Sequence, residues 1–167
     1  MRRREFTTLL GVAAVVWPGA VRAQMSSRVG LLSSTAPLAD NSPFGASLIR
    51  GLADNGYSPG RNLAFERRGA EGRLDRLPGL VAELAASKVD VIVTSGYPAA
   101  LAAKQASAIP IVAINAGDPV GTGLVASLAR PGGNMTGISD VSAELTPKRM
   151  ELLKLIAPGL RRVAILW

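Results

Sequence analysis

Hydroxyl, amide and carboxylate side chains recur directly after the apolar runs of this sequence, where they could bind a small polar solute. The candidates share a position at the expected end of a strand: Ser33, Ser34, Thr35, Ser95, Gly96, Tyr97, Asn115 and Asp118. Such groups can hold the carboxylate and ammonium of a zwitterion, and the amino termini of the helices that follow favour an anion. The same residue types also cap helices, so position alone leaves a structural role open for each.

The composition excludes several classes of chemistry. The sequence has no Cys and no His, so it offers neither a disulfide nor a thiolate metal site, and it lacks the commonest general base. It also shows no Walker loop, no serine nucleophile elbow and no carboxylate cluster with metal-ligand spacing. The arginine pairs at residues 67–68 and 161–162 have no aromatic platform beside them, which argues against nucleic-acid binding. These absences narrow the chemistry that is available, and we expect a protein that uses no cofactor or metal ion.

One motif supports a different function. Residues 121–126 (GTGLVA) fit the dinucleotide-binding pattern G-x-G-x-x-A, and Asp140 follows about twenty residues later. That fingerprint should begin directly at the end of a strand, whereas residues 116–120 intervene here. An exported enzyme that binds a nucleotide cofactor through Gly121–Ala126 therefore stays the alternative hypothesis.

The first twenty-three residues have the pattern of an export signal. Arginines open the chain, the apolar run of residues 9–17 follows, and Val21-Arg22-Ala23 resembles a signal-peptidase site. Arg3, Arg4 and Phe6 resemble the twin-arginine core, and Ala23 would be the last residue removed. The apolar run has about half of the roughly 20 residues that a membrane-spanning helix needs. We expect a periplasmic protein that begins near Gln24 and has no stable membrane span.

Strand-like and helix-like segments alternate after the signal. The expected strands are residues 28–32, 62–67, 89–94, 109–115 and 135–141. The expected helices are residues 44–55, residues 77–85, an alanine-rich helix that ends near Gln105, and residues 124–128. A last helix is expected to be capped by Thr146 and stopped by Gly159, with Leu152, Leu153 and Ile156 on its inner face. This alternation predicts an α/β fold: a doubly wound parallel sheet with helices on both faces. In such sheets ligands bind beyond the carboxyl ends of the strands, which is where the candidate residues lie.

The last apolar segment, residues 162–167, has the pattern of a strand without a following element. It could complete this sheet as an edge strand. We favour a second domain that starts here, so the expected organisation is an export signal at residues 1–23, a first lobe at 24–160, and the first strand of a truncated second lobe at 161–167.

Two segments carry a family resemblance: DPVG at residues 118–121 and SLARPGGN at 127–134. With the order of the remaining mature sequence, residues 24–167, they resemble the substrate-binding proteins of ABC transporters, in the group whose characterised members are tryptophan- or tyrosine-type binding proteins. The resemblance implies two lobes of the periplasmic binding protein type I kind that close on a solute.

By position, the resemblance places the ligand contacts of this lobe at residues 33–35, 95–97 and 115–118. It implies a solute-binding component of an import system that is not an enzyme, with an amino acid-like solute and with a permease and an ATPase as partners. A periplasmic module that senses a ligand without transport is a further alternative.

Overall fold

A computed structural model describes residues 26–140 and 142–164 of the chain, with side chains for 26–140 and 145–164. The predicted export signal at residues 1–23, including Arg3, Arg4, Phe6 and Ala23, lies outside the described residues. So do residues 165–167 of the predicted last strand.

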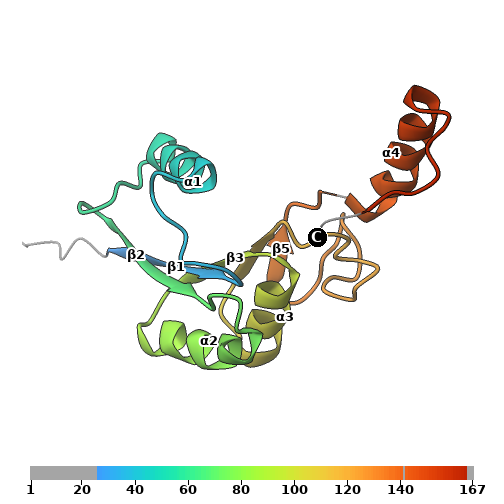
Figure 1. The fold of residues 1–167 in the computed structure, drawn as a ribbon. Coiled ribbons are helices and arrows are strands. Elements are labelled where there is room, and N and C mark those ends of the chain that lie inside the picture. The colour runs from blue at the N-terminus through green and yellow to red at the C-terminus, as the bar shows by residue number, and fades with distance from the viewer. Residues whose placement is uncertain (1–25, 141, 165–167) are drawn as a thin grey trace, which may run out of the picture.

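Five parallel strands form one sheet at the centre of the molecule (Figure 1). They are β1 (Ser27–Ser33), β2 (Leu63–Gly69), β3 (Val91–Ser95), β4 (Ile111–Ile114) and β5 (Met135–Gly137), in the spatial order β2-β1-β3-β4-β5. The chain moves outward from β1 in one direction to β2 and in the other to β3, so the strand order reverses between β1 and β3. This reversal is the switch point at which doubly wound sheets bind ligands.

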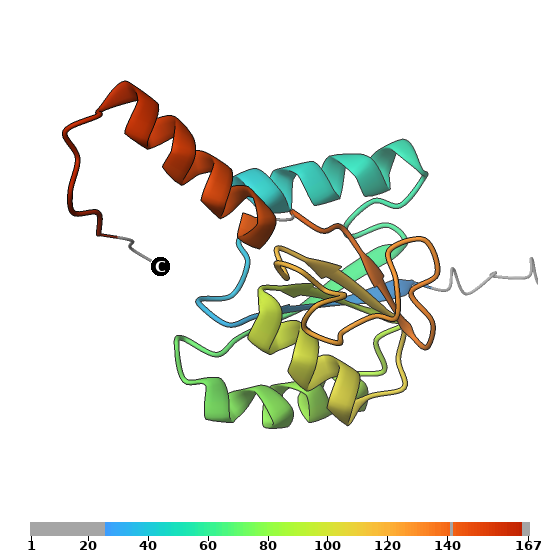
Figure 2. The same cartoon turned by 90° about the vertical axis from the view of Figure 1, so that its right-hand side faces the viewer.

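Helices cover both faces of this sheet, as the sequence predicts. Helix α1 (Pro43–Asp54) lies on one face, while α2 (Leu77–Ala86) and α3 (Tyr97–Ala106) lie side by side on the other (Figures 1 and 2). A 3-10 turn, η1 (Leu74–Arg76), leads into α2. The predicted α/β class and doubly wound architecture are confirmed.

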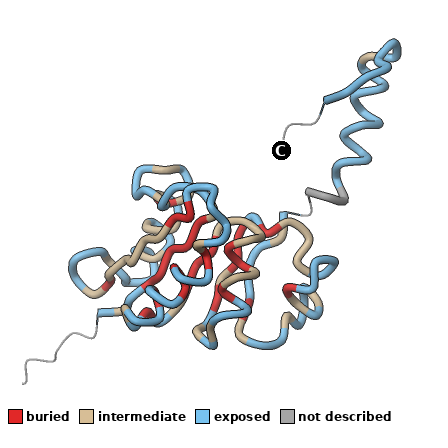
Figure 3. The backbone as a smooth tube through the Cα atoms, turned by 60° about the horizontal axis from the view of Figure 1, so that its bottom comes forward, coloured by how far each residue is buried: buried red, intermediate tan, exposed pale blue. Residues whose placement is uncertain are grey.

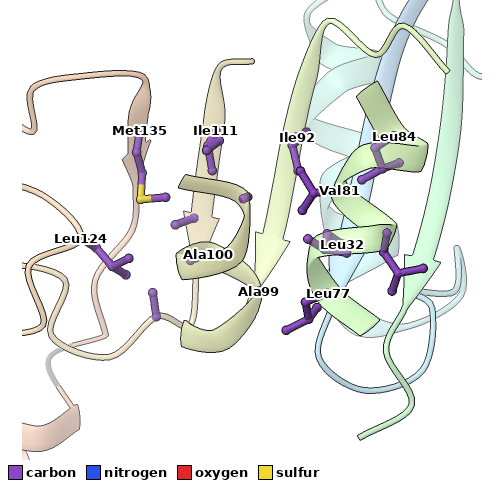
Figure 4. Packing of buried hydrophobic residues seen from close by; sticks show 14 of the residues in the cluster. Leu32, Leu77, Val81, Leu84, Ile92, Ala99, Ala100, Ile111, Leu124 and Met135 are labelled. Atoms are coloured by element: carbon purple, nitrogen blue, oxygen red, sulfur yellow. The ribbon is translucent and has the colours of Figure 1, made fainter. Parts of the chain in front are cut away.

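Alternate strand residues build a separate core on each face of the sheet. Leu32, Ile92 and Ile111 point toward α2 and α3 (Figure 4), whereas Val29 and Val93 point toward α1. Gly30 allows α2 to approach closely, because a Cβ there would stand 3.2 Å from a methyl carbon of Leu84. Both cores end at the last residues of β1 and β3, Ser33 and Ser95, where the side chains become polar.

The segment between β4 and β5 differs from the prediction. Residues 124–128 form turns and bends instead of a helix, although Leu124 is buried and packs in the larger core. Gly117 and Gly123 take positive φ angles, and the amide of Ala126 donates to the carbonyl of Pro131 across a turn. These turns use the backbone groups that a helix would need. The next strand, β5, ends at Gly137, earlier than predicted.

The last helix, α4 (Ser142–Ile156), also differs from the prediction. It begins before Thr146, so that Thr146 and Pro147 lie inside it, and it ends before Gly159. Leu152, Leu153 and Ile156 do not form an inner face: their side chains are exposed, and the helix projects away from the sheet (Figures 1 and 3). Residues 161–164 form neither helix nor strand. None of the described elements lies close enough to cover this helix.

Candidate functional site

The ends of three neighbouring strands bring most of the predicted residues to one edge of the sheet. Ser33 and Ser95 are register partners at the ends of β1 and β3. The Gly96 amide, directly after β3, donates to the carbonyl of Ile114 at the end of β4 (3.0 Å). The groups at residues 33–35, 95–97 and 115–118 therefore follow adjacent strands, and the first two flank the switch point.

The side chains of Ser33 and Thr35 are hydrogen-bonded to one another. Their hydroxyls lie 3.0 Å apart, and the Thr35 amide donates to Ser33 Oγ (3.1 Å). The carbonyls of the same turn accept from the loop after β2: Ala70 N donates to Ser33 O, and Glu71 N donates to Thr35 O. The loop after β1 is thus held in place from both sides. Ser33 therefore has a structural role, and Ser34 is the residue of this loop that could bind a ligand.

That adjacent residue, Ser34, carries a buried hydroxyl that meets no hydrogen-bond partner in the described part of the chain. It faces Gly96, and Ser34 Oγ lies 3.5 Å from the place where a Cβ on Gly96 would stand. Thr94 is fully buried, and its Oγ1 likewise has no partner among the described residues. Unsatisfied buried hydroxyls are uncommon and call for an explanation such as a ligand or a bound water.

Sequence reasoning missed Thr94, which it treated only as the last residue of a buried strand. The alternation along β1 and β3 was the available signal, since Leu32 and Thr94 are register partners. Thr94 therefore points to the same face of the sheet as Leu32, and Ser34 follows directly after β1.

Helix α3 adds an anion preference to this edge. Its N-cap is Gly96 (φ 89°), which has no side chain to cap the helix, and Pro98 in the first turn has no N–H. The amides of Tyr97 and Ala99 are first-turn donors without an intrahelical acceptor. The Tyr97 side chain packs against the core cluster, so its contribution to a site at this edge comes from the main chain.

Asn115 and Asp118 follow β4 in a tight turn. Asn115 is exposed and takes a positive φ of 50°. Asp118 Oδ1 accepts from the amides of Val120 (3.1 Å) and Gly121 (2.9 Å), which is the capping role that its residue type allows. Ser139, after β5, donates to the carbonyl of Gly117 (3.0 Å) and holds the turn from the other side.

The glycines of the dinucleotide-like segment have a local explanation. A side chain on Gly121 would overlap the carboxylate of Asp118, so this glycine permits the Asp118 turn. No helix begins within or directly after Gly121–Ala126, since residues 121–134 are turns, bends and loop, and a phosphate-binding fingerprint needs a helix amino terminus there. The segment therefore lacks the structural context that the alternative hypothesis requires.

Other parts of the described structure offer little further chemistry. A hollow of about 30 Å³ lies beside β5, and none of the eight predicted residues lines it. Among the described residues, no three acidic side chains are placed to share a metal ion. None of the helices in the described part of the chain is long and apolar enough to cross a membrane.

Comparison with known proteins identifies the family. The family described as ABC transporter substrate binding protein matches residues 44–167. The chain belongs to this family. Its parallel sheet with helices on both faces is the α/β fold of the similar substrate-binding structures.

Several relatives of known structure or assigned role are similar to the chain. A tyrosine-binding protein of Clostridioides difficile (strain R20291) is 32% identical over 120 residues, which are 71% of this chain and 34% of that protein. A conserved domain protein from Vibrio cholerae has a TM-score of 0.70 and 33% identity, over 80% of this chain and 45% of that one.

Two further solved structures are similar to the chain. An ABC domain in complex with L-Trp from Streptococcus pneumonia has a TM-score of 0.58 and 27% identity, over 68% of this chain and 38% of that chain. A ligand-free, open substrate-binding protein with adhesive properties from Clostridium difficile has a TM-score of 0.63 and 29% identity, over 80% and 44% of the two chains. The chain thus spans less than half the length of the relatives that it matches.

Proposed function

We propose that this chain supplies one wall of the solute-binding cleft of an ABC import system, and that the solute is an amino acid with an aromatic side chain. Support for the solute class comes from the tyrosine-binding relative and from the similar structure that holds L-Trp. In this proposal the chain captures its ligand without changing it, and its partners are a permease and an ATPase.

The observation that carries the proposal is the Ser34 hydroxyl, which has no hydrogen-bond partner among the described residues. It lies beside the amino terminus of α3, whose N-cap is Gly96, at the switch point between β1 and β3. A carboxylate placed there would accept hydrogen bonds from Ser34 Oγ and from first-turn amides of α3, and the partial positive charge of the helix end would stabilise it. The ammonium group would then lie toward Asn115 and Asp118, after β4.

We also propose export to the periplasm through the twin-arginine route, because Arg3, Arg4 and Phe6 stand in the expected order before the apolar run. A substrate-binding protein of an import system works outside the cytoplasmic membrane, so both proposals agree. Replacing Arg3 and Arg4 by Lys should leave unprocessed precursor in the cytoplasm, which cell fractionation detects. Normal export of that variant would exclude this route.

Titration followed by NMR tests the site directly. The chain without residues 1–23, labelled with ¹⁵N, is titrated with L-tyrosine, L-tryptophan and tyramine, which lacks the carboxylate. We expect weak but saturable shifts at Ser34, Gly96 and Tyr97 with the two amino acids and none with tyramine. Weak binding is expected because good sites bury roughly 70–90% of a ligand, and one wall buries less.

Two serine variants separate a binding role from a structural one. Ser34→Ala should abolish the shifts while leaving the rest of the spectrum in place. Ser87→Ala is the matched control, since Ser87 lies beside Arg28 at the opposite edge of the sheet. Unchanged binding by Ser34→Ala, or equal shifts with tyramine, would contradict the proposed carboxylate site.

A further inference from the structure

The turn after β2 is bound to the loop after β1 through three consecutive main-chain amides. The amides of residues 70–72 donate to the carbonyls of residues 33–35 in three hydrogen bonds: Ala70 N to Ser33 O (2.9 Å), Glu71 N to Thr35 O (2.9 Å) and Gly72 N to Ser34 O (3.0 Å). The first bond continues the ladder between β1 and β2, whose last register pair is Ser33 with Gly69. The other two lie beyond the sheet and hold the loop that carries the Ser34 hydroxyl.

The amides of these two further bonds belong to residues in the left-handed backbone region. Glu71 has a φ of 55° and Gly72 a φ of 79°. Glycine takes such an angle without steric cost, whereas a residue with a side chain is strained there. The Glu71 carboxylate accepts from Arg76 Nη1 (3.1 Å), which ties the turn to η1. Strained positions of this kind persist where the surrounding contacts hold them, and they gather at binding sites.

The same bonds decide which chemical groups the loop after β1 offers to a solute. A main-chain carbonyl accepts hydrogen bonds and is therefore the group that would bind an ammonium. The carbonyls of residues 33–35 all accept from the turn at residues 70–72. The groups left for a solute are the Ser34 hydroxyl and the first-turn amides of α3, and an amide only donates. This edge therefore favours an acceptor such as a carboxylate over an ammonium.

Gly72 is the residue of the turn that binds Ser34 itself, and packing does not require a glycine there. A Cβ on Gly72 would meet no described atom within 4 Å, so only the positive φ disfavours a side chain. Gly60, before β2, is a close match: its φ is 76°, a Cβ there would also meet no described atom within 4 Å, and its amide donates to Leu63 O (3.2 Å). The two glycines differ in what their amides hold, which is Ser34 in one case and the first residue of β2 in the other.

We infer that the turn at residues 70–72 sets the ligand preference of the loop after β1, and that Gly72 is a positioning residue that holds Ser34 in place to bind a carboxylate. The inference rests on the solute site proposed at Ser34. It adds that this loop does not recognise the ammonium of the solute. It also adds that a residue outside the three predicted groups controls affinity through the main chain of Ser34.

Three glycine variants test this role in the ¹⁵N-labelled chain without residues 1–23. Gly72→Ala strains the turn, Gly60→Ala strains the matched turn before β2, and Gly72→Asn is the conservative variant, because Asn tolerates the left-handed region. Each is titrated with L-tyrosine, with desaminotyrosine, which keeps the carboxylate but lacks the ammonium, and with tyramine. Urea unfolding is measured alongside, together with hydrogen exchange of the Thr35 amide, which donates to Ser33 Oγ within the loop.

Both alanine variants should lower the urea midpoint of unfolding by similar amounts, because they introduce the same backbone strain. Only Gly72→Ala should weaken the affinity for L-tyrosine, by about tenfold, and speed exchange of the Thr35 amide by a similar factor. Gly72→Asn should recover most of both losses. In the parent chain, desaminotyrosine should shift the Ser34 resonance as L-tyrosine does.

Two results would overturn the inference and leave the proposed solute site standing. One is an affinity for L-tyrosine that is equal in Gly72→Ala and Gly60→Ala. The other is a Ser34 shift that L-tyrosine produces and desaminotyrosine does not. A parent chain in which no ligand shifts Ser34 would contradict the proposed site itself. Thr35 exchange then decides the positioning role alone: faster exchange in Gly72→Ala than in Gly60→Ala supports it, and equal exchange overturns it.

Discussion

Helices α2 and α4 both carry apolar residues at helical spacing, but these residues are buried in α2 and exposed in α4. In α2, Leu80, Val81 and Leu84 repeat at helical spacing and are at most 6% exposed. In α4, Leu152 and Ile156 repeat in the same way and are 49% and 81% exposed. The spacing of apolar residues therefore predicts that a helix has a face to bury, but it does not predict which surface buries that face.

The position of each helix in the topology explains the difference. Helix α2 connects β2 with β3, which lie on either side of β1, so the crossover holds it against the sheet. Helix α4 follows β5, the edge strand of the described sheet, and no later described strand pairs with that sheet. No strand in the described part of the chain therefore returns α4 to this core.

The largest expected effect comes from truncating one residue of each helix. Leu84→Ala should lower the free energy of unfolding by about 2.7–5 kcal/mol, because Leu84 is fully buried and its removal leaves a cavity against β1. Ile156→Ala in the same chain should change it by less than about 0.5 kcal/mol, as expected for an exposed side chain. Urea unfolding followed by circular dichroism measures both. Similar losses for the two variants would mean that α4 packs on the sheet in solution.

The strands and most helices could be predicted because each has a local cause. Apolar runs marked β1, β3 and β4, and the helical spacing of apolar residues marked α1 and α2. The predicted helix at residues 124–128 was wrong because one buried side chain, Leu124, produced an apolar signal inside a segment whose glycines and Asp118 form turns. The environment of α4 could not be predicted, since it depends on contacts outside its own sequence.

For the candidate site, the sequence likewise predicted the location but not the role of each residue. Its location followed from the rule that ligands bind beyond strand ends, and the structure brings the three predicted groups to one edge. The separate roles of Ser33 and Ser34 depend on whether each hydroxyl meets a hydrogen-bond partner among the described residues. Adjacent serines look alike in a sequence, and only the folded structure, in which β1 ends at Ser33, distinguishes them.

A pair of glycines extends the comparison to the main chain. A Cβ on Gly69, at the end of β2, would overlap the main chain of Ala36 and Pro37, whereas a Cβ on Gly159, after α4, would meet nothing within 4 Å. Gly69→Ala should therefore lower the free energy of unfolding by about 1–3 kcal/mol, as overpacking does. Gly159→Ala should leave it unchanged or raise it slightly, by restricting the unfolded chain.

Thermal and urea unfolding of the two alanine variants provide the measurement, and the loop after β1 gives a second readout. Because Gly69→Ala should displace the turn at residues 33–37, it should also weaken the amino-acid-induced NMR shift at Ser34. A Gly69→Ala variant as stable as the parent would show that this loop moves freely, and it would remove the support for a rigid site at the end of β1.

The smallest expected difference concerns polar contacts at the surface of the two regions. Ser42 Oγ accepts from the Gly45 amide (3.0 Å) and donates to the Ala39 carbonyl (2.6 Å), so it caps α1 and fixes the entry of the chain. Ser42→Ala should cost about 0.5–2 kcal/mol of unfolding free energy, the usual value of an N-cap. In α4, Glu151 pairs with Lys148 (2.7 Å), but both side chains are more than half exposed, and Glu151→Ala should cost less than about 0.5 kcal/mol.

Salt separates the two contributions further. A rise from 0.1 to 1 M NaCl shortens the screening length from about 10 to about 3 Å, which removes most of an exposed ion pair's effect. The effect of Glu151→Ala should then vanish, while that of Ser42→Ala should persist, since the Ser42 cap joins neutral groups. A Glu151→Ala loss that equals the Ser42→Ala loss and survives high salt would place Glu151 in a buried contact, and α4 would then have a partner within this chain.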